Sequence, residues 1–305
     1  MSTRHFIDID QLDHADLRNI IDSAKKMKQE GRNFPRPDER RVHDTLIMIF
    51  EKASTRTRVS FDVAMRQLGG QTIVLNSNDM QLGRGEPVSD TAQVLSRYAE
   101  LIMMRTTSHD SILELAKYAT IPVVNGLSNL SHPCQIMADI LTFEEKKFEI
   151  EKAKIAWIGD VNNVARSWIH AAARFGFDLR LGCPREYGPS NELANWIERE
   201  KANVVWIEDP HQAVEDVDCV VTDVFVSMGD SDAERRNKVL ADYIVDSDLM
   251  AKADSDAIFM HCLPAQRGSE VAAEIIDGPQ SVVFDEAENR LHAQKSILAW
   301  CLKMI

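Results

Sequence analysis

Short runs of consecutive apolar residues alternate along the chain with longer segments in which apolar residues recur at helical spacing. Ten runs read as buried strands, at residues 45–50, 71–75, 100–105, 120–124, 153–159, 177–183, 203–207, 218–223, 256–262 and 281–284. Unbroken apolar runs of this length, separated by ten or more helix-like residues, are typical of parallel strands covered by helices on both faces. The pattern therefore predicts an α/β fold.

Ten strands exceed one small sheet, so we expect two domains, each a mainly parallel sheet flanked by helices. The length of 305 residues fits two domains. Residues 137–154 form a helical pattern that changes from apolar to densely charged, which places the boundary between domains 1–147 and 148–305. A last amphipathic stretch, about residues 290–305, is expected to return and pack on the first domain.

Composition narrows the class of protein. A formal charge of −13 would repel nucleic acid and anionic membrane surfaces, so neither is an expected partner. No apolar run reaches membrane-spanning length, and the acidic start of the chain is unlike a signal peptide, so we expect a cytoplasmic protein. The five cysteines form no CxxC pair, and no His, Cys, Asp and Glu set has metal-ligand spacing. We therefore expect reduced thiols and neither a required metal nor a cofactor.

Residues 54–58 read Ser-Thr-Arg-Thr-Arg, directly after the first strand and before an amphipathic segment. Ser54 or Thr55 suits the N-cap of the predicted helix, whose N-terminus attracts anions. Arginine adds charge and paired donors, so the cluster predicts a phosphate site; a capped helix with two solvated arginines is the plainer alternative. A nucleotide site is not favoured, because the P-loop pattern is absent and only Gly159 stands where a dinucleotide fingerprint has three glycines.

Other polar residues also follow predicted strands. In the first half, Arg105 ends a strand, and His132 and Gln135 precede a helix that Pro133 suits as a first-turn residue. In the second half, polar side chains follow two strands, at Asp223, Ser227, Met228, His261 and Cys262. A surface arginine, a capping histidine and a core cysteine are the plainer interpretations. Together, a phosphate site in one domain and an acidic, amide and thiol set in the other predict group transfer between two small substrates.

At this point the chain resembles the aspartate/ornithine carbamoyltransferase family along essentially its full length. The resemblance rests on eight stretches in the family's order: STRTR, QLGRGEP, MMRT, HPCQ, GDVNNV, DVFVSMG, HCLPA and ENRLHAQ. It departs at Val161, where glycine is more usual. The resemblance implies transfer of the carbamoyl group of carbamoyl phosphate to an amine. Arg84 where aspartate-specific members carry lysine, and SMG at 227–229, imply that the amine is L-ornithine, giving L-citrulline and phosphate in arginine biosynthesis.

The resemblance also assigns residues to sites. It implies that carbamoyl phosphate is bound by Ser54, Thr55, Arg56, Thr57, Gln81, Arg105, His132, Gln135, Cys262, Leu263 and Arg290. It implies that ornithine is bound by Asn163, Asp223, Ser227 and Met228. Arg105, His132 and Cys262 are the expected catalytic residues. Gln81 resembles the residue that members contribute to a neighbouring subunit's site, which implies a homo-oligomer, in this family typically a trimer.

Several alternatives stay open at this stage. The proton of the ornithine amine passes either to Cys262, polarised by Asp223 or His261, or to the departing phosphate. Another amine acceptor such as putrescine is the nearest rival. A non-catalytic anion-binding subunit and a nicotinamide-dependent oxidoreductase are rivals from other classes.

Overall fold

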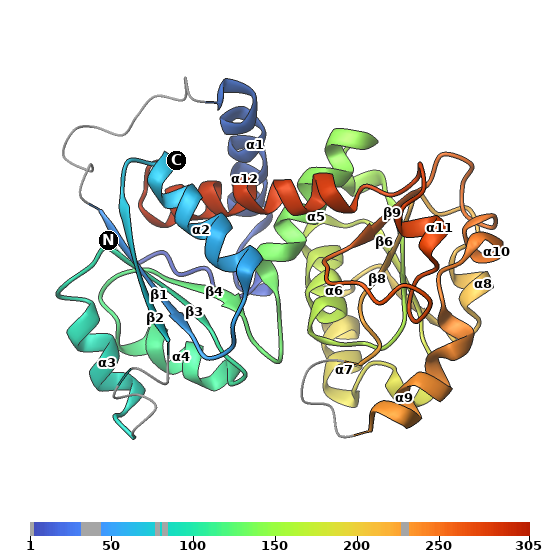
Figure 1. Cartoon of the computed structure of the whole chain (residues 1–305), viewed down its shortest axis with the longest axis horizontal. Coiled ribbons are helices and arrows are strands. Elements are labelled where there is room, and N and C mark those ends of the chain that lie inside the picture. The colour runs from blue at the N-terminus through green and yellow to red at the C-terminus, as the bar shows by residue number, and fades with distance from the viewer. Residues whose placement is uncertain (1–2, 32–43, 77–79, 81–84, 227–231) are drawn as a thin grey trace. The chain divides into compact units, whose positions relative to one another are not determined.

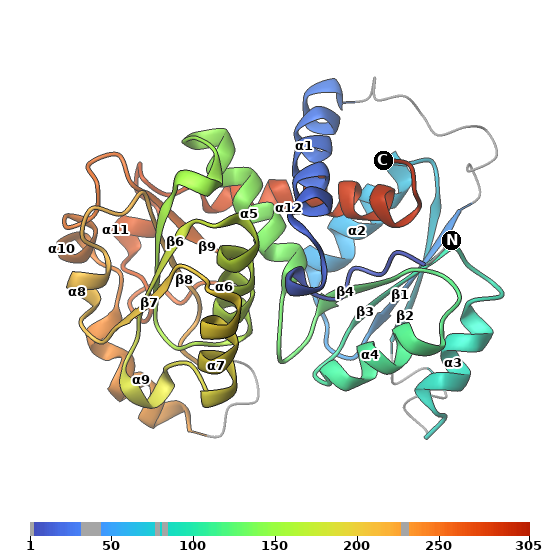
Figure 2. The same ribbon diagram turned by 180° about the vertical axis from the view of Figure 1, so that it is seen from behind.

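The computed structural model describes residues 3–31, 44–76, 80, 85–226 and 232–305. The chain forms two compact units, one made of Met1–Leu141 with Glu288–Ile305 and the other of Thr142–Ala287. Each unit is a parallel sheet with helices on both faces (Figure 1 and Figure 2). Among the described residues, no helix has both the length and the apolar character needed to cross a membrane.

The first unit contains a sheet of strand order β2-β1-β3-β4, in which every pairing is parallel. Its strands are β1 (Thr45–Phe50), β2 (Gln71–Asn76), β3 (Leu101–Arg105) and β4 (Val123–Leu127). One face carries α3 (Val88–Leu95) and α4 (His109–Tyr118). The opposite face carries α1 (His14–Glu30), α2 (Thr55–Gln67) and the C-terminal part of α12 (Val283–Cys301) (Figure 1). The returning C-terminal helix predicted from the sequence is therefore confirmed.

Apolar burial explains why these runs become strands. Every residue of the central strand β1 is buried, as the unbroken run TLIMIF predicts for a strand covered on both faces. Ile47 and Ile49 pack in one cluster with Ile112 and Leu115 of α4. The edge strand β2 is only partly buried, because it has a neighbour on one side. The sheet core thus holds the ends of β1 and β3 at a defined spacing.

The second unit contains a sheet of order β7-β6-β5-β8-β9, again fully parallel. Its strands are β5 (Lys154–Ile158), β6 (Asp178–Gly182), β7 (Val204–Ile207), β8 (Cys219–Thr222) and β9 (Ile258–His261). On one face lie α6 (Asn163–Phe175) and α7 (Asn191–Glu200). On the other lie α8 (Pro210–Ala213), α9 (Ala233–Leu240), α10 (Ser247–Met250) and α11 (Ala273–Ile276), whose apolar residues share one core cluster.

The tenth predicted strand, residues 281–284, is wrong. Within the described residues, Ser281 forms only an isolated bridge to Phe259, and α12 begins at Val283. Val282 and Val283 are buried, so the apolar run reflects packing rather than sheet pairing. Asp285 and Glu286 stand in the first helical turn, where negative charge favours a helix N-terminus.

The division between the two units falls within α5 (Pro133–Lys146), after Leu141. The boundary expected from composition, after residue 147, lies a few residues further along the chain. Both places are in the segment where the pattern changes from apolar to charged.

The strand orders locate one special position in each sheet. After β2 the chain crosses to the other side of β1, and after β7 it crosses to the other side of β5. Adjacent loops diverge at such a topological switch point, which leaves a crevice at the carboxyl ends of the strands. The switch points lie between β1 and β3 in the first unit and between β5 and β8 in the second.

Candidate active site

The first polar cluster lies at the β1/β3 switch point. Ser54 is the N-cap of α2, and its hydroxyl accepts a hydrogen bond from the Thr57 backbone amide at 3.4 Å. The N-cap predicted at Ser54 or Thr55 is therefore Ser54. Thr55, Arg56 and Thr57 form the first turn, where the positive end of the helix dipole favours an anion.

The Thr57 hydroxyl accepts hydrogen bonds from two arginines. Arg105, at the end of β3, donates to Thr57 Oγ1 at 3.1 Å, and Arg290 of α12 donates at 3.2 Å. A hydroxyl accepts two hydrogen bonds and donates one. With both acceptor positions used by guanidinium groups, the Thr57 hydroxyl proton is left to point at a further acceptor. The buried Thr57 hydroxyl is therefore a hydrogen-bond donor with a fixed orientation.

His132 and Gln135 join the same cluster from α5. The helix begins at Pro133, and at its start the His132 backbone carbonyl accepts a hydrogen bond from the Gln135 backbone N–H at 3.1 Å. Arg290 donates to Gln135 Oε1 at 2.6 Å. The first unit therefore contains eight of the residues predicted to bind carbamoyl phosphate: Ser54, Thr55, Arg56, Thr57, Arg105, His132, Gln135 and Arg290.

Electrostatics in this cluster favour an anionic ligand. Burial, followed by the positive charges of Arg290, Arg105 and Arg56, holds the pKa of His132 well below its usual value. The imidazole is therefore neutral at pH 7 and carries one N–H donor without adding charge. The same three arginines provide the positive field that a phosphate dianion requires.

The second cluster lies at the β5/β8 switch point of the other unit. Asn162 caps α6, accepting from the backbone amides of Val164 at 2.9 Å and Ala165 at 3.1 Å. Its amide nitrogen donates to Asp223 Oδ2 at 3.0 Å, just beyond β8. Asn163, a predicted substrate residue, is the first residue of α6. The cap therefore orients the Asp223 carboxylate beside Asn163.

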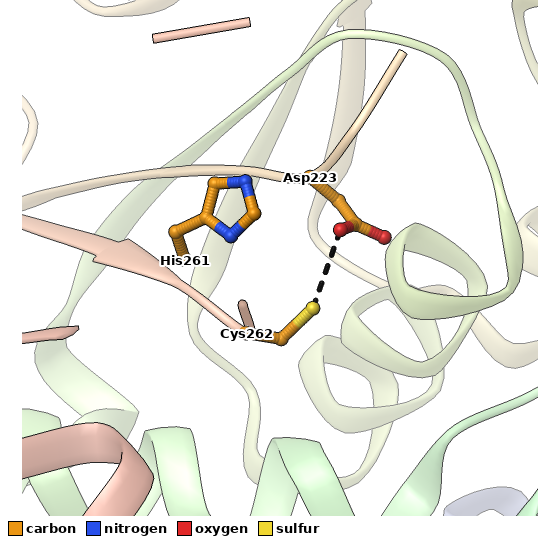
Figure 3. Close-up of side chains that lie close together, drawn as sticks. All are labelled: Asp223, His261 and Cys262. Carbon is orange, nitrogen blue, oxygen red and sulfur yellow. Dashed lines mark hydrogen bonds between the residues drawn. The ribbon is translucent and has the colours of Figure 1, made fainter. Parts of the chain in front are cut away.

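Cys262 contributes a thiol to this second cluster from the end of β9. Its sulfur lies 3.3 Å from Asp223 Oδ1 and donates to it (Figure 3). Of the two polarising partners proposed from the sequence, the structure places Asp223 in contact with the thiol. His261 is engaged elsewhere: its Nδ1 accepts from the Leu263 amide at 2.9 Å, and its Nε2 faces Glu270 at 3.2 Å.

The His261 contacts also hold the turn that carries Leu263. Leu263 has a φ of 57°, a left-handed conformation that side chains with a Cβ adopt rarely. The buried Glu270 carboxylate accepts from the His261 ring and from the Gln266 amide at 2.5 Å, so it anchors both ends of the turn. Asp223, His261 and Cys262 offer ligand-type atoms within 4.8 Å of one another. Because both His261 nitrogens already have partners, this histidine has no lone pair directed at a metal ion.

Three predicted site residues, Gln81, Ser227 and Met228, lie outside the described residues. The second unit contains the other four predicted site residues: Asn163 and Asp223 of the ornithine set, and Cys262 and Leu263 of the carbamoyl phosphate set.

Comparison with known proteins decides the family. Residues 4–145 match the carbamoyl-P binding domain of aspartate/ornithine carbamoyltransferase, and residues 151–301 match its Asp/Orn binding domain. The chain belongs to the aspartate/ornithine carbamoyltransferase family. It is 56% identical over 303 residues to an ornithine carbamoyltransferase of Rhodopseudomonas palustris BisA53, covering 98% of this chain and 97% of the relative. It is also 56% identical over 306 residues to that of Bradyrhizobium diazoefficiens, covering 100% and 99%.

Solved carbamoyltransferase structures show the same fold. The ornithine carbamoyltransferase of Pyrococcus furiosus superposes with a TM-score of 0.91 at 44% identity, covering 98% of this chain and 96% of that one. The anabolic ornithine carbamoyltransferase of Campylobacter jejuni has a TM-score of 0.92 at 38% identity, covering 100% of both chains. The two-sheet α/β fold predicted from the sequence is therefore confirmed.

Two features beside the second cluster were not predicted from the sequence: the ion pair of Asp160 with Arg236, and the contact of Asn162 with Asp223. Asp160, after β5, pairs with Arg236 of α9, and the Arg236 guanidinium also donates to the Phe225 carbonyl at 2.7 Å and stacks on Tyr187. These partners are distant in sequence, so no local pattern reveals them. Asn162 was detectable, because asparagine between a strand and a helix is a common N-cap.

The pKa of the Asp160 carboxyl can be tested through the pH dependence of stability. Burial, assisted by the nearby Asp223 charge, raises the pKa of Asp160 to about 6, although Arg236 acts in the opposite direction. The folded state therefore holds this proton more tightly than the unfolded state, and stability from this group falls as pH rises from about 4 to about 6. The stability of the wild type relative to Asp160→Asn should therefore depend on pH. We expect the difference in unfolding free energy, wild type minus variant, to be about 1 kcal/mol lower at pH 7.5 than at pH 5.

Urea unfolding at the two pH values measures this difference. Asp277→Asn is the matched control, because Arg267 lowers the pKa of the exposed Asp277 and its charge does not change between pH 5 and pH 7.5. A difference that rises with pH, or stays flat as for the control, would contradict a raised pKa at Asp160.

Proposed function

We propose that the protein transfers the carbamoyl group of carbamoyl phosphate to the δ-amine of L-ornithine, giving L-citrulline and phosphate. The observation that carries the proposal is the Thr57 hydroxyl held by Arg105 and Arg290 at the N-terminus of α2. This arrangement offers an anion site and an oriented donor side by side. The two relatives named above are ornithine carbamoyltransferases, and this chain aligns with nearly their full length, which supports ornithine as the acceptor.

In the first step, the phosphate end of the donor binds at the start of α2. Ser54, Thr55 and the Arg56 side chain surround the phosphate, with Arg105 and Arg290 beside it. The carbonyl oxygen of the donor then accepts from Thr57, Arg105 and neutral His132. These groups stabilise the negative charge that grows on this oxygen during attack, which is the main requirement for acyl transfer from an activated donor.

In the second step, the amine attacks the carbonyl carbon. Asp223 and Asn163 bind the α-amino acid end of ornithine, together with Ser227 and Met228. An alkyl amine with a pKa of roughly 10.4 is uncharged in only about one molecule in a few thousand at pH 7, so a proton acceptor is needed. Cys262, held against Asp223, orients the δ-amine. The amine proton passes either to the Cys262 sulfur, while the thiol's own proton moves to Asp223, or to the departing phosphate. Leu263 completes the site beside Cys262.

The active enzyme is proposed to be a homotrimer in which Gln81 reaches a neighbouring site, working in the cytoplasm in arginine biosynthesis without a metal or cofactor. The oligomeric part follows from the likeness of the QLGRGEP stretch to other family members. Sedimentation of the purified chain tests it, and a monomer with full activity would contradict it.

One assay tests the proposed activity. Purified protein with carbamoyl phosphate is expected to release phosphate and form a ureido product with ornithine, at a kcat/KM at least about 100-fold higher than with putrescine, lysine or aspartate, because Asp223 and Asn163 pair with polar groups that the other amines lack or place differently. Faster transfer to putrescine would favour the rival acceptor. Absence of transfer to every amine would favour a non-catalytic subunit.

A further inference from the structure

The side-chain amide of Gln135 is held from both ends. Gln135 is 1% exposed, and its Nε2 donates to Asp139 Oδ1 at 2.8 Å. Its Oε1 accepts from Arg290 at 2.6 Å. An ionised carboxylate only accepts hydrogen bonds and a guanidinium only donates them. The two neighbours therefore agree on one orientation, with the amide nitrogen toward Asp139 and the oxygen toward the cluster of Thr57, Arg105 and Arg290.

The two contacts on Gln135 differ in what they depend on. Asp139 lies four residues further along α5, so its contact follows from helix geometry alone. Arg290 comes from α12, 155 residues away in sequence, and is proposed to bind the donor's phosphate. Phosphate competes with Gln135 for the Arg290 Nη1 donor, whereas the contact with Asp139 is independent of the ligand and still specifies which end of the amide faces the carbamoyl group. Asp139 is itself 1% exposed, so it acts on the site through Gln135.

The transferred group makes this orientation matter. A carbamoyl group carries an NH2 with two hydrogen-bond donors, whereas an acetyl group has a methyl in the same place and nearly the same shape. An amide oxygen presented at that place pairs with the NH2, and an amide nitrogen would leave two donors facing each other. A site built to pair a polar group rejects an analogue that lacks it far more strongly than an apolar pocket does.

We propose that Asp139 is a positioning residue that makes the site select carbamoyl phosphate over acetyl phosphate, by holding the Gln135 amide with its oxygen toward the donor. This inference rests on the proposed function, because it takes carbamoyl phosphate as the ligand of the first cluster. Asp139 touches no reacting atom. Its contribution is to remove the second orientation of the amide.

The test compares Asp139→Asn with the wild type. Asparagine keeps the volume, but its amide pairs with Gln135 in either orientation, so position 139 no longer favours one orientation and only Arg290, for which phosphate competes, still does. We measure KM for carbamoyl phosphate, and the inhibition constants of acetyl phosphate and inorganic phosphate against it. The expected result is a roughly tenfold smaller ratio of the acetyl phosphate constant to the carbamoyl phosphate KM, with the phosphate constant unchanged within about twofold. Inorganic phosphate lacks the carbamoyl end, so a general disturbance of the site would weaken it in parallel.

A double-mutant cycle keeps the test independent of stability. In a Gln135→Ala background, Asp139→Asn is expected to leave the acetyl-to-carbamoyl ratio unchanged, because the residue through which it acts is gone. Ser296→Ala is the control; it removes another buried polar contact of the first unit, to the Ile20 carbonyl, and is expected to leave all three constants unchanged.

The outcomes separate two failures. If the wild type transfers no carbamoyl group to ornithine, the proposed function fails. If the wild type is active and Asp139→Asn keeps the wild-type ratio, or weakens inorganic phosphate as much as carbamoyl phosphate, the positioning role of Asp139 is overturned.

Discussion

Arg56→Ala is expected to lower kcat/KM for carbamoyl phosphate by about 100- to 1,000-fold, the range found when a preorganised donor to developing charge is removed. Arg56 stands in the first turn of α2, and its charge acts on the buried His132 together with those of Arg105 and Arg290. Its side chain is exposed, so the fold should lose little stability. Steady-state kinetics with both substrates, and inhibition by inorganic phosphate, measure the effect; phosphate inhibition should weaken as well.

Arg66→Ala is the matched control for Arg56→Ala. Arg66 is on the same helix, exposed, and pairs with Asp62 one turn earlier. Its removal changes the net charge equally and disturbs an ion pair worth only a few tenths of a kcal/mol. Near-normal activity in Arg66→Ala with loss in Arg56→Ala would place the effect at the helix N-terminus. Equal activity in both variants would refute Arg56 as a phosphate ligand.

Asp223→Asn is expected to raise KM for ornithine by about 100-fold, because removing one partner of a desolvated charge pair costs about 3 kcal/mol. Asp223 is 8% exposed and is oriented by Asn162 and Cys262. Asparagine has the same shape, so the fold should persist. Binding of inorganic phosphate, measured by calorimetry, should not change, because the proposed ligands of the phosphate group lie in the other unit.

Cys262→Ser separates the thiol from the carboxylate. Serine can still donate to Asp223 Oδ1, so ornithine affinity should fall less than in Asp223→Asn. If the thiol takes or orients the amine proton, kcat should fall and the pH profile of kcat should shift. Wild-type rates, ornithine affinity and pH profile in Cys262→Ser would leave the departing phosphate as the acceptor. Asp277→Asn, exposed on the same unit, is the control for Asp223→Asn, because it also removes one carboxylate.

Much of the site was predictable because its residues stand at the ends of apolar runs. Arg105 follows LIMM and Cys262 follows IFMH, and the carboxyl ends of parallel strands meet at one edge of a sheet. The Ser54 cap and the Pro133 start are local signals that the structure reproduces. The pair formed by Gln135 and Asp139 could also be predicted from the sequence, since these two polar residues, four apart in the otherwise apolar stretch 134–141, lie on one face of a helix.

The tenth predicted strand and the Asp160–Arg236 pair show where such reasoning stops. An apolar run such as SVVF indicates only that its residues are buried. The sequence does not distinguish burial in a loop or helix end that packs on the core from burial in a sheet. Arg236 reaches Asp160 across 76 positions, and no spacing rule covers that separation.

The amino-acid order alone determined the alternation of strands and helices, the two-sheet organisation and the residues at the strand ends, because periodicity and capping depend on neighbours within a few positions. Only the tertiary structure decided the strand orders β2-β1-β3-β4 and β7-β6-β5-β8-β9, and hence which loops meet at a switch point. It also decided that Thr57 accepts from two arginines, one from β3 and one from α12, so that its proton points away from both. Those contacts join segments 48 and 233 residues apart, and only the packing of helices on the sheet brings such segments together.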